Sequence, residues 1–316
     1  GRVHDPAAPV DTATEPADDA AAPHNGAVEP AATAPGGPVP AAAAPESAAP
    51  PLVSAYDLVV LDLDGVVYLG EEPVPGAVEA IERLRREGPR VVYATNNASR
   101  SAEEVAAVLA KLGVDADAGD VVTSAMAAAE ALRDRLAPGS AVLVVGADAL
   151  AEEIRRVGLR PVTSADDEPA AVVQGYAPQV GWRQLAEATV AIRAGAQWVA
   201  TNTDLTLPTP RGPLPGNGSL VAALRAALGR EPDLVVGKPQ PALFQAAIRL
   251  ASAKRALVVG DRLDTDIAGA RHAGLDSLLV LTGVTAKEDL AGVPAEQRPT
   301  YLGADLGALF APAVRA

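Results

Sequence analysis

Residues 58–65 read Leu-Val-Val-Leu-Asp-Leu-Asp-Gly, and this stretch decides the fold. Its first four residues form a continuous apolar run, which is typical of a strand covered on both faces of a sheet. Asp62 and Asp64 follow, and two carboxylates beside a buried run are costly unless a positive charge lies near them. Gly65 then allows the backbone to turn away sharply. The stretch therefore predicts a buried strand that brings two carboxylates to one edge of a sheet.

Similar apolar runs recur along the chain, separated by amphipathic stretches. They occupy residues 91–94, 142–145, 171–173, 234–236, 257–259 and 278–281. Alternation of buried strands with helices implies parallel βαβ units with right-handed crossovers. We therefore predict an α/β fold whose core is a doubly wound, Rossmann-like parallel sheet. In such sheets, ligands bind beyond the carboxyl ends of the strands.

Three of the amphipathic stretches have clear helix ends. Ser101 and Glu104 form a capping box, and Gly113 marks the end of that helix. The other two stretches each carry one apolar face and end at a glycine. These faces comprise Val78, Ile81 and Leu84 ahead of Gly88, and Leu220, Leu224 and Leu228 in a helix that is expected to begin at Ser219 and end before Gly229.

Polar residues follow two other predicted strands. Thr95, Asn96 and Asn97 offer a hydroxyl and two amides just before a helix, which suits an anion. The same residues would also serve in an ordinary capped strand-to-helix turn. Lys238 follows the run at 234–236, where a lysine taken alone is typical of the protein surface. Each signal by itself is compatible with a structural role.

The run at 257–259 leads into an acidic turn. Gly260 is followed by Asp261, Asp264 and Asp266. Asp264 and Asp266 could be N-cap residues of the next helix, whereas Asp261 lies too early for that role. Asp261 is therefore a candidate site residue.

Composition excludes several classes of protein. The 316 residues include no Cys, which excludes a disulfide scaffold, a cysteine nucleophile and a thiolate metal site. A formal charge of −14 and 3% aromatic residues argue against a nucleic-acid partner. No apolar stretch approaches the roughly 20 residues that would cross a membrane. A cytoplasmic location is expected.

Residues 1–52 differ in composition from the rest of the chain. They contain 17 Ala and 11 Pro and no Ile, Phe, Tyr, Trp or Met. Such a segment cannot bury enough apolar surface to offset its ordering entropy, and it has no apolar run of the kind found in a secretion signal. It is expected to be a disordered extension, either of no defined role or with a role in partner binding. Its role and the native start of the chain stay open.

The order of the strand-end motifs resembles that of the haloacid dehalogenase-like phosphohydrolase superfamily. Its four motifs are Asp-x-Asp, then Thr, then Lys, then Gly-Asp with a further Asp five residues on. The sequences Asp-Leu-Asp-Gly-Val-Val-Tyr at 62–68, Ala-Thr-Asn-Asn-Ala-Ser-Arg at 94–100, Pro-Gly-Asn-Gly-Ser at 215–219 and Gly-Asp-Arg-Leu-Asp-Thr-Asp at 260–266 are similar to one branch of it. That branch carries a large α/β cap and contains the p-nitrophenyl, phosphoglycolate, pyridoxal phosphate and glycerol-3-phosphate phosphatases. The resemblance covers about residues 56–309.

The family inserts its cap between the threonine and lysine motifs. Here 143 residues separate Thr95 from Lys238, far more than one crossover connection requires. We therefore expect a core formed by 53–139 and 233–316, with an inserted α/β cap at 140–232. Within the cap, residues 201–218 form a long loop rich in Pro and Gly, and such loops are usually functional.

The resemblance implies a role for each motif residue. Asp62 is the nucleophile and forms an aspartyl-phosphate, and Asp64 acts as general acid and then as general base. Lys238 supplies a fixed positive charge, while Thr95 and the amides at Asn96 and Asn97 would donate to phosphate oxygens. Mg²⁺, which prefers a few carboxylates together with phosphate and water, is the implied cofactor. Its ligands would be the Asp62 side chain, the Asp64 carbonyl and Asp261, with Asp266 behind them.

The resemblance also implies a small-molecule phosphate ester as the substrate. The 201–218 loop offers Asn202, Asp204 and Arg211 as substrate-binding candidates and no aromatic ring. That composition favours a glycerol-3-phosphate-like polyol phosphate, in line with the similarity to the bacterial glycerol-3-phosphate phosphatases. Phosphoglycolate, pyridoxal phosphate or a nucleoside monophosphate are the alternatives. A homodimer through the cap is possible.

Three other functions stay open at this point. A phosphorylation-switch receiver also places Asp, Thr and Lys at strand ends, but it is a single small domain and needs neither a second aspartate nor an insert. A phosphotransferase or mutase could use the same scaffold. A pseudo-enzyme that binds a ligand without turnover is the alternative from a different class, although every motif residue is present.

Overall fold

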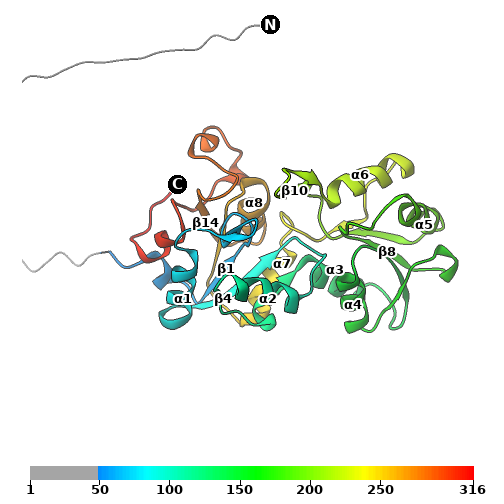
Figure 1. Cartoon of the computed structure of the whole chain (residues 1–316), viewed down its shortest axis with the longest axis horizontal. Helices are drawn as coiled ribbons and strands as arrows, with labels where there is room; N and C mark the ends of the chain where they lie inside the picture. The colour runs from blue at the N-terminus through cyan, green and yellow to red at the C-terminus, as the bar shows by residue number, and fades with distance from the viewer. Residues whose placement is uncertain (1–48) are drawn as a thin grey trace, which may run out of the picture. The chain divides into compact units, whose positions relative to one another are not determined.

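The computed structural model describes residues 49–316 (Figure 1). Residues 1–48, most of the predicted disordered extension, lie outside the described part. The chain enters the core at Leu52, which belongs to a 3₁₀ turn (Leu52–Ala55) and is only 4% exposed. The N–H of Leu52 donates to the carbonyl of Ala311 at 2.8 Å. Leu52 therefore belongs to the folded body, although the expected extension ran through it.

The larger sheet has six parallel strands in the order β15-β14-β13-β1-β4-β5. Strand β1 lies at its centre, between β13 and β4, and all four of its residues are buried. The strands span Leu58–Leu61 (β1), Arg90–Thr95 (β4), Val121–Thr123 (β5), Ala256–Gly260 (β13), Asp276–Val280 (β14) and Tyr301–Gly303 (β15). This sheet is the doubly wound core that the sequence predicts.

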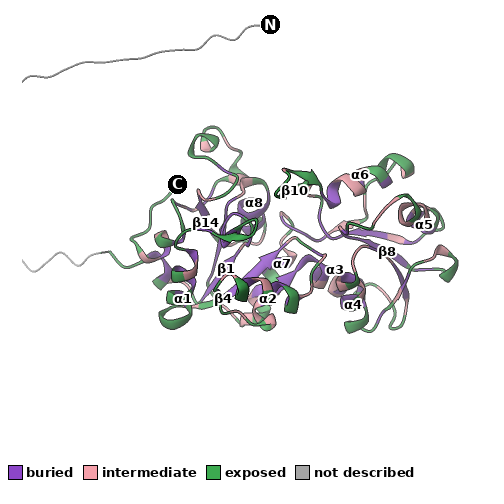
Figure 2. Ribbon diagram, viewed as in Figure 1, coloured by how far each residue is buried: buried purple, intermediate pink, exposed green. Residues whose placement is uncertain are grey.

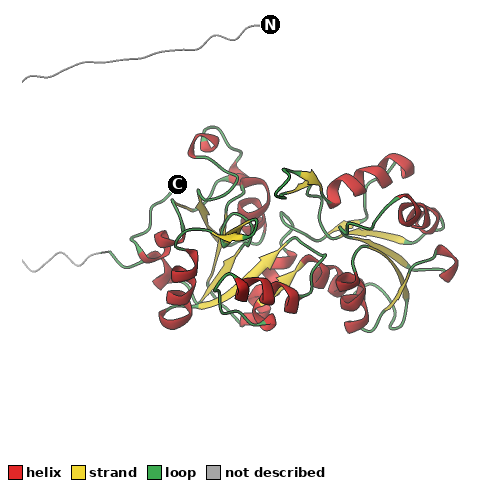
Figure 3. Cartoon of the chain, viewed as in Figure 1, coloured by secondary structure: helices red, strands yellow, loops and turns green. Residues whose placement is uncertain are grey.

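Helices cover both faces of the larger sheet, as Figure 3 shows. Helices α1 (Ala77–Glu87) and α2 (Ala102–Lys111) share one apolar cluster with the side chains on one face. Helices α3 (Ser124–Arg133), α7 (Ala242–Ala251) and α8 (Ala268–His272) pack on the other face. Successive residues of β1 therefore enter different clusters, which explains why its sequence is apolar without alternation.

The smaller sheet has five parallel strands in the order β12-β9-β8-β6-β7. Helix α4 (Asp148–Arg156) covers one face, and helices α5 (Trp182–Arg193) and α6 (Asn217–Leu228) pack on the other. The strands span Ala141–Val145 (β6), Arg160–Val162 (β7), Ala171–Gln174 (β8), Gln197–Ala200 (β9) and Leu234–Val235 (β12). Strand β12 pairs with β9 in this sheet, although the predicted core range begins at 233.

Buried side chains join the two sheets. The cluster on the α3 side of the larger sheet continues into α4 and the facing strands of the smaller sheet, through residues such as Leu132, Leu150 and Val173. In Figure 2 the inner strands of both sheets are mostly buried, whereas β7 and β12 at the edges of the smaller sheet are partly exposed, as are the outer faces of the helices. No helix among residues 49–316 is long and apolar enough to cross a membrane.

Two predicted helix starts have different outcomes. At α2 the capping box is confirmed, because the Glu104 N–H donates to Ser101 Oγ at 3.1 Å and the Ser101 N–H donates to Glu104 Oε2 at 2.8 Å. The helix expected from Ser219 begins instead at Asn217. The Ser219 hydroxyl donates to the carbonyl of Leu205, so a tertiary contact uses the group that was expected at the helix start.

Two short hairpins complete the described fold. One hairpin pairs β2 (Tyr68–Leu69) with β3 (Glu72–Pro73) directly after the Asp-x-Asp motif. The other pairs β10 (Thr206–Leu207) with β11 (Leu214–Pro215). The second hairpin lies inside the stretch predicted as the 201–218 loop, so that loop has regular structure of its own.

Candidate active site

Three neighbouring strands deliver the polar residues of the site. Strands β13, β1 and β4 lie side by side and run in the same direction, so their carboxyl ends meet at one edge of the sheet. Asp62 follows β1, Asp261 follows β13, and Thr95 ends β4. Strand pairing alone therefore brings together residues that lie up to 199 positions apart in the sequence.

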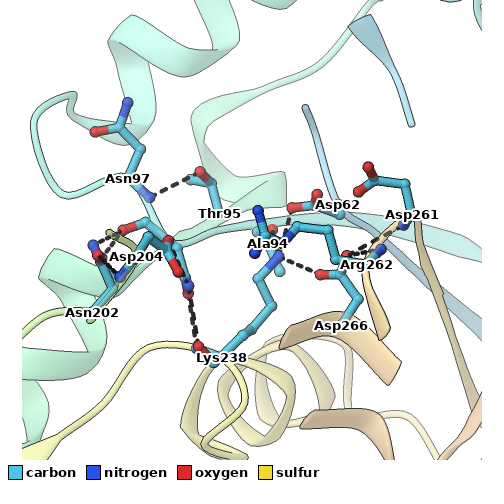
Figure 4. Close-up of polar contacts among 12 residues, drawn as sticks. Asp62, Ala94, Thr95, Asn97, Asn202, Asp204, Lys238, Asp261, Arg262 and Asp266 are labelled. Atoms are coloured by element: carbon cyan, nitrogen blue, oxygen red, sulfur yellow. Dashed lines mark hydrogen bonds and ion pairs between the residues drawn. The ribbon is translucent and has the colours of Figure 1, made fainter. Parts of the chain in front are cut away.

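Lys238 enters the site from the smaller sheet and is 4% exposed. It lies three residues after β12, so the strand that precedes it is not part of the core sheet. Its Nζ donates to Asp62 Oδ1 at 2.5 Å, to Asp266 Oδ1 at 2.7 Å and to the Ala94 carbonyl at 3.3 Å (Figure 4). The buried ammonium group therefore has three acceptors and bridges two carboxylates.

Asp62, Asp261 and Asp266 form a carboxylate cluster in which the nearest ligand atoms all lie within 4.8 Å of one another. Asp261 and Asp266 are each 1% exposed. The Val284 N–H donates to Asp261 Oδ2 at 2.7 Å, whereas Asp261 Oδ1 is buried and has no hydrogen-bond partner among the described residues. Gly65 has a φ of +80°, and a Cβ there would collide with the Asp261 carboxyl, which explains the glycine after the Asp-x-Asp motif.

The charges in the carboxylate cluster do not balance. When all three carboxyls are ionised, their charge exceeds that of the single ammonium of Lys238 by two, and the Arg262 guanidinium, which also acts on Asp261, is paired with Asp264. Burial and the charge of Asp266 raise the pKa of Asp62 well above its usual range, against the opposing effect of Lys238. Burial and Asp266 likewise raise the pKa of Asp261 to about 6. Burial alone would lower the pKa of Lys238, but its two carboxylate partners outweigh that effect and raise it, so the lysine stays charged.

The residues present fit a hard divalent cation. The cluster offers carboxylate oxygens, its excess of two negative charges matches the charge of such an ion, and the orphaned Asp261 Oδ1 lacks a partner. Mg²⁺ binds through one or two carboxylates together with substrate phosphate and water. Asp64 is not part of the cluster.

Asp64 is exposed, and it lies just beyond Asp62 at the start of the turn into β2. Nearby protein partly desolvates its carboxyl and raises its pKa, while Lys238 and Arg100 act in the opposite direction. Because the side chain is still open to water, this is a smaller effect than a closed site would produce.

The residues after β4 take up different positions. Thr95 is 5% exposed, and its Oγ1 accepts a hydrogen bond from the Asn97 N–H at 3.1 Å, which leaves the hydroxyl hydrogen free to donate. The Asn97 side chain is exposed and accepts from Ser99, so it points away from the carboxylates (Figure 4). The Asn96 side chain is bonded to the backbone of Lys238 and to Asp204.

The three substrate-binding candidates of the 201–218 loop do not all lie near the site. Asp204 lies within reach of Asn96, and burial raises its pKa. Asn202 is 5% exposed and donates from Nδ2 to the carbonyl of Asn96 at 2.7 Å. Arg211 is exposed between β10 and β11, and among the described residues no hydrogen bond or ion pair joins its side chain to the site. The structure brings the first two to the site and leaves Arg211 apart.

The sequence analysis assigned no role to two cations near the site. Arg262 forms an ion pair with Asp264 at 2.9 Å, and its charge also acts on Asp204. The positive charge of Arg100 lowers the pKa of Asp64. Both residues occur within the quoted motif runs, but their positions showed no periodicity or spacing that would distinguish them from surface arginines.

Comparisons with known proteins find two matching families and several relatives. Residues 59–160 match the family described as haloacid dehalogenase-like hydrolase, and residues 235–309 match a second HAD-like hydrolase family. D-glycerol 3-phosphate phosphatase of Mycobacterium tuberculosis is 55% identical over 258 residues, which cover 82% of this chain and 72% of that protein. An acid sugar phosphatase of Staphylococcus saprophyticus is 37% identical over 255 residues, covering 79% of this chain and 95% of that protein.

Solved structures show the same similarity over about four fifths of the chain. The crystal structure of a glycerol phosphate phosphatase from Mycobacterium tuberculosis in complex with magnesium matches with a TM-score of 0.80 at 54% identity, covering 82% of this chain and 78% of that chain. The 4-nitrophenylphosphatase of Thermotoga maritima matches with a TM-score of 0.75 at 33% identity, covering 82% of this chain and 97% of that chain.

Proposed function

This chain belongs to the haloacid dehalogenase-like hydrolases and is a Mg²⁺-dependent phosphoric monoester hydrolase, and we propose that it acts on small polyol phosphates of the glycerol-3-phosphate type. The observation that carries the proposal is the position of Asp62. Its carboxylate follows the central strand, accepts a hydrogen bond from the buried Lys238, and belongs to a carboxylate cluster with an unbalanced negative charge.

We propose that Asp62 is the nucleophile. Its carboxylate oxygen forms a bond to phosphorus as the bond from phosphorus to the ester oxygen breaks, which yields an aspartyl-phosphate and an alkoxide. Asp62, the Asp64 carbonyl and Asp261, with Asp266 behind them, would hold Mg²⁺, which would supply positive charge that offsets the repulsion between carboxylate and phosphate. Lys238 adds a fixed ammonium on the same side, already oriented by its two carboxylate partners.

Asp64 supplies the proton that the leaving alkoxide needs. It then removes a proton from water as the water oxygen attacks phosphorus, which releases inorganic phosphate and restores the Asp62 carboxylate. The pKa of Asp64 is already raised by partial desolvation. A bound phosphate dianion and further loss of solvent would raise it more, so that the group is protonated when substrate is present. Thr95 and the backbone N–H groups of Asn96 and Asn97 would hold the phosphate oxygens.

The proposed cap at residues 140–232 contains the smaller sheet except for its edge strand β12. Its 201–218 segment supports a polyol substrate, because Asp204 lies next to the site and no aromatic ring is available there to stack a base or a pyridine. Asn202 and Asp204 are the proposed substrate contacts near the site, and Arg211, which the structure leaves apart from the site, is proposed as a third. The relatives named for glycerol phosphate favour the same substrate class.

A side-by-side substrate panel tests this proposal. Phosphate release is measured with glycerol 3-phosphate, phosphoglycolate, pyridoxal phosphate and a nucleoside monophosphate, each with and without Mg²⁺. Unpaired hydrogen-bonding groups cost a poor substrate roughly 1–3 kcal/mol each, so glycerol 3-phosphate should exceed the nucleotide and pyridoxal phosphate in kcat/KM by at least about tenfold. A nucleotide or pyridoxal phosphate as the best substrate would overturn the substrate assignment and leave the phosphatase activity standing.

Two other expectations from the sequence stay proposals. Pairing of two copies through the cap has support in helix α5, where Trp182 is 83% exposed and Val190, about two turns further along, is 59% exposed. Light scattering on the wild type and on Trp182→Ala tests it, since a cap-mediated dimer should dissociate in the variant. A cytoplasmic location is proposed from the small phosphate esters on which the enzyme acts.

A further inference from the structure

The Asn96 side-chain amide forms two reciprocal hydrogen bonds with the backbone of Lys238. The Lys238 N–H donates to Asn96 Oδ1 at 2.8 Å, and Asn96 Nδ2 donates to the Lys238 carbonyl at 3.2 Å. The two residues lie 142 positions apart, on either side of the whole smaller sheet. This double hydrogen bond therefore fixes the backbone of the lysine after the chain returns from the smaller sheet.

Asn96 also contacts the loop that follows β9 of the smaller sheet, through both its side chain and its backbone. Asn96 Nδ2 donates to Asp204 Oδ2 at 3.1 Å, and the Asn96 carbonyl accepts from Asn202 Nδ2 at 2.7 Å. Asn217, at the start of α6, donates in turn to the Asn202 carbonyl at 2.8 Å. One residue of the core thus joins the loop after β9 to the segment that carries the lysine.

Close packing at Gly237 supports this arrangement. A Cβ at that position would lie 2.5 Å from the Thr201 carbonyl oxygen, 2.8 Å from the Asn202 Cβ and 2.9 Å from Asn96 Oδ1. These distances are far inside van der Waals contact, so no larger residue fits between the two segments. The position of Lys238 is therefore set by contacts to both Asn96 and the loop after β9.

The hydrogen bonds of Asn96 leave its side chain with no free donor. A primary amide has two N–H donors, and here they are used by Asp204 and by the Lys238 carbonyl. Its oxygen already accepts the Lys238 N–H. Substrate contact through this side chain would require breaking one of these hydrogen bonds. The Asn96 backbone N–H can still donate to a phosphate oxygen.

We propose that the Asn96 side chain is a positioning residue, which sets the place of the Lys238 ammonium against Asp62 and makes it depend on the loop that holds Asp204. The proposal rests on the proposed function, in which Lys238 acts on the phosphoryl group. A displaced lysine would lower the rate of phosphoryl transfer, because oriented charge stabilises the transition state more than bound substrate. Variants of Asn96 should therefore lower kcat much more than they raise KM.

Exchanging the side chains of Asn96 and Asp204 tests whether the hydrogen bond between them affects turnover. In Asn96→Asp the new carboxylate can still accept the Lys238 N–H, but it has no donor for the Lys238 carbonyl or for Asp204. In Asn96→Asp with Asp204→Asn the amide at 204 can donate to the carboxylate at 96, and the net charge equals that of the wild type. Gln245→Glu, on the exposed side of α7, is the matched control for an added negative charge.

The expected results are measured in kcat and KM with p-nitrophenyl phosphate and with glycerol 3-phosphate. Asn96→Asp should lose about tenfold or more in kcat with KM within about threefold of the wild type. The exchanged double variant should regain part of that loss in kcat, because the bond to residue 204 returns while the bond to the Lys238 carbonyl does not, and Gln245→Glu should match the wild type. Where Asn96→Asp fails to fold, Asn96→Ser is used, with the same loss in kcat and not in KM expected.

Two results would overturn the inference. One is a rise in KM with kcat unchanged in either Asn96 variant, which would place the side chain on the substrate. The other is a double variant no more active than Asn96→Asp, which would show that the bond to Asp204 has no effect on turnover. A separate experiment tests the proposed function itself. Phosphate release that persists in Asp62→Asn would refute Asp62 as the nucleophile, whatever the Asn96 variants show.

Discussion

Asp62→Asn should abolish turnover and yet leave the metal-free protein at least as stable as the wild type. The substitution keeps the volume of the side chain and an oxygen that can accept from Lys238, but it removes the attacking carboxylate. At an effective dielectric constant of about 20, two charges at the 4.8 Å upper limit of the cluster's separations repel by about 3.5 kcal/mol, and closer charges repel more. Asp62 meets two such carboxylates, Asp261 and Asp266, so the substitution relieves about 7 kcal/mol.

The lost attraction is of the same size. The ammonium of Lys238 lies 2.5 Å from Asp62 Oδ1, which corresponds to about 7 kcal/mol at the same dielectric constant. Because the two effects nearly cancel, the cost of burying a charged carboxylate decides the outcome, and an amide is cheaper to bury. Melting temperatures in a chelator at pH 8 should therefore be equal or higher for Asp62→Asn than for the wild type. Added Mg²⁺ should stabilise the wild type more, since the variant has lost one charge.

Phosphate release by the variant should fall by at least about 10³-fold. Asp115→Asn, whose side chain is 89% exposed, is the matched control and should leave both turnover and melting temperature unchanged. More than a tenth of wild-type activity in Asp62→Asn would refute Asp62 as the nucleophile. A melting temperature several degrees below that of the wild type in chelator would refute the electrostatic reasoning.

Three further predictions concern Asp64, Asp261 and Leu52. Asp64→Asn should slow the first step much less with p-nitrophenyl phosphate than with glycerol 3-phosphate in single-turnover measurements, because nitrophenolate leaves without a proton; equal losses would contradict its role as general acid. The Mg²⁺ concentration for half-maximal activity should rise as pH falls below about 6. The reason is that the pKa of Asp261 is raised to about 6, so protons then compete with the cation for its carboxylate. A half-maximal Mg²⁺ concentration that is constant between pH 5 and 8 would exclude this competition. Leu52→Ala should cost about 2–5 kcal/mol of unfolding free energy in urea, whereas Val314→Ala, at a residue 62% exposed, should cost little; equal stabilities would place Leu52 outside the core.

Local signals in the sequence predicted the central strand and the first helices well. The run at 58–61 is buried on both faces of the sheet, as its unbroken apolar character indicates. The capping box at Ser101 forms because both of its partners lie within one turn of helix. Strand-end placement then brings Asp62, Thr95 and Asp261 together, since parallel strands end at the same edge.

Local sequence patterns could not predict contacts between residues far apart in the chain. Strand β12 joins the smaller sheet through its pairing with β9, which no apolar run can specify. The helix expected at Ser219 begins two residues earlier, where the side chain of Asn217 is fixed by the carbonyls of Asn202 and Gln174. In both cases the partner lies elsewhere in the chain, so periodicity and capping rules could not reveal it.

The boundary of the folded part illustrates the same limit. Composition assigned residues up to Leu52 to the extension, because Ala and Pro dominate the sequence before it. Leu52 is nevertheless buried through contacts near the other end of the chain, including the hydrogen bond to Ala311. A tertiary contact of this kind overrides the composition of the neighbouring residues.

Trapping of the phosphoenzyme tests the account most directly. Asp64→Asn is mixed with p-nitrophenyl phosphate and Mg²⁺, because the first step then needs no proton while the second step lacks its base. After an acid quench, mass spectrometry should find one phosphoryl group on the peptide that contains Asp62. Release of nitrophenolate with no phosphorylated peptide, or a phosphoryl group on another residue, would contradict the account.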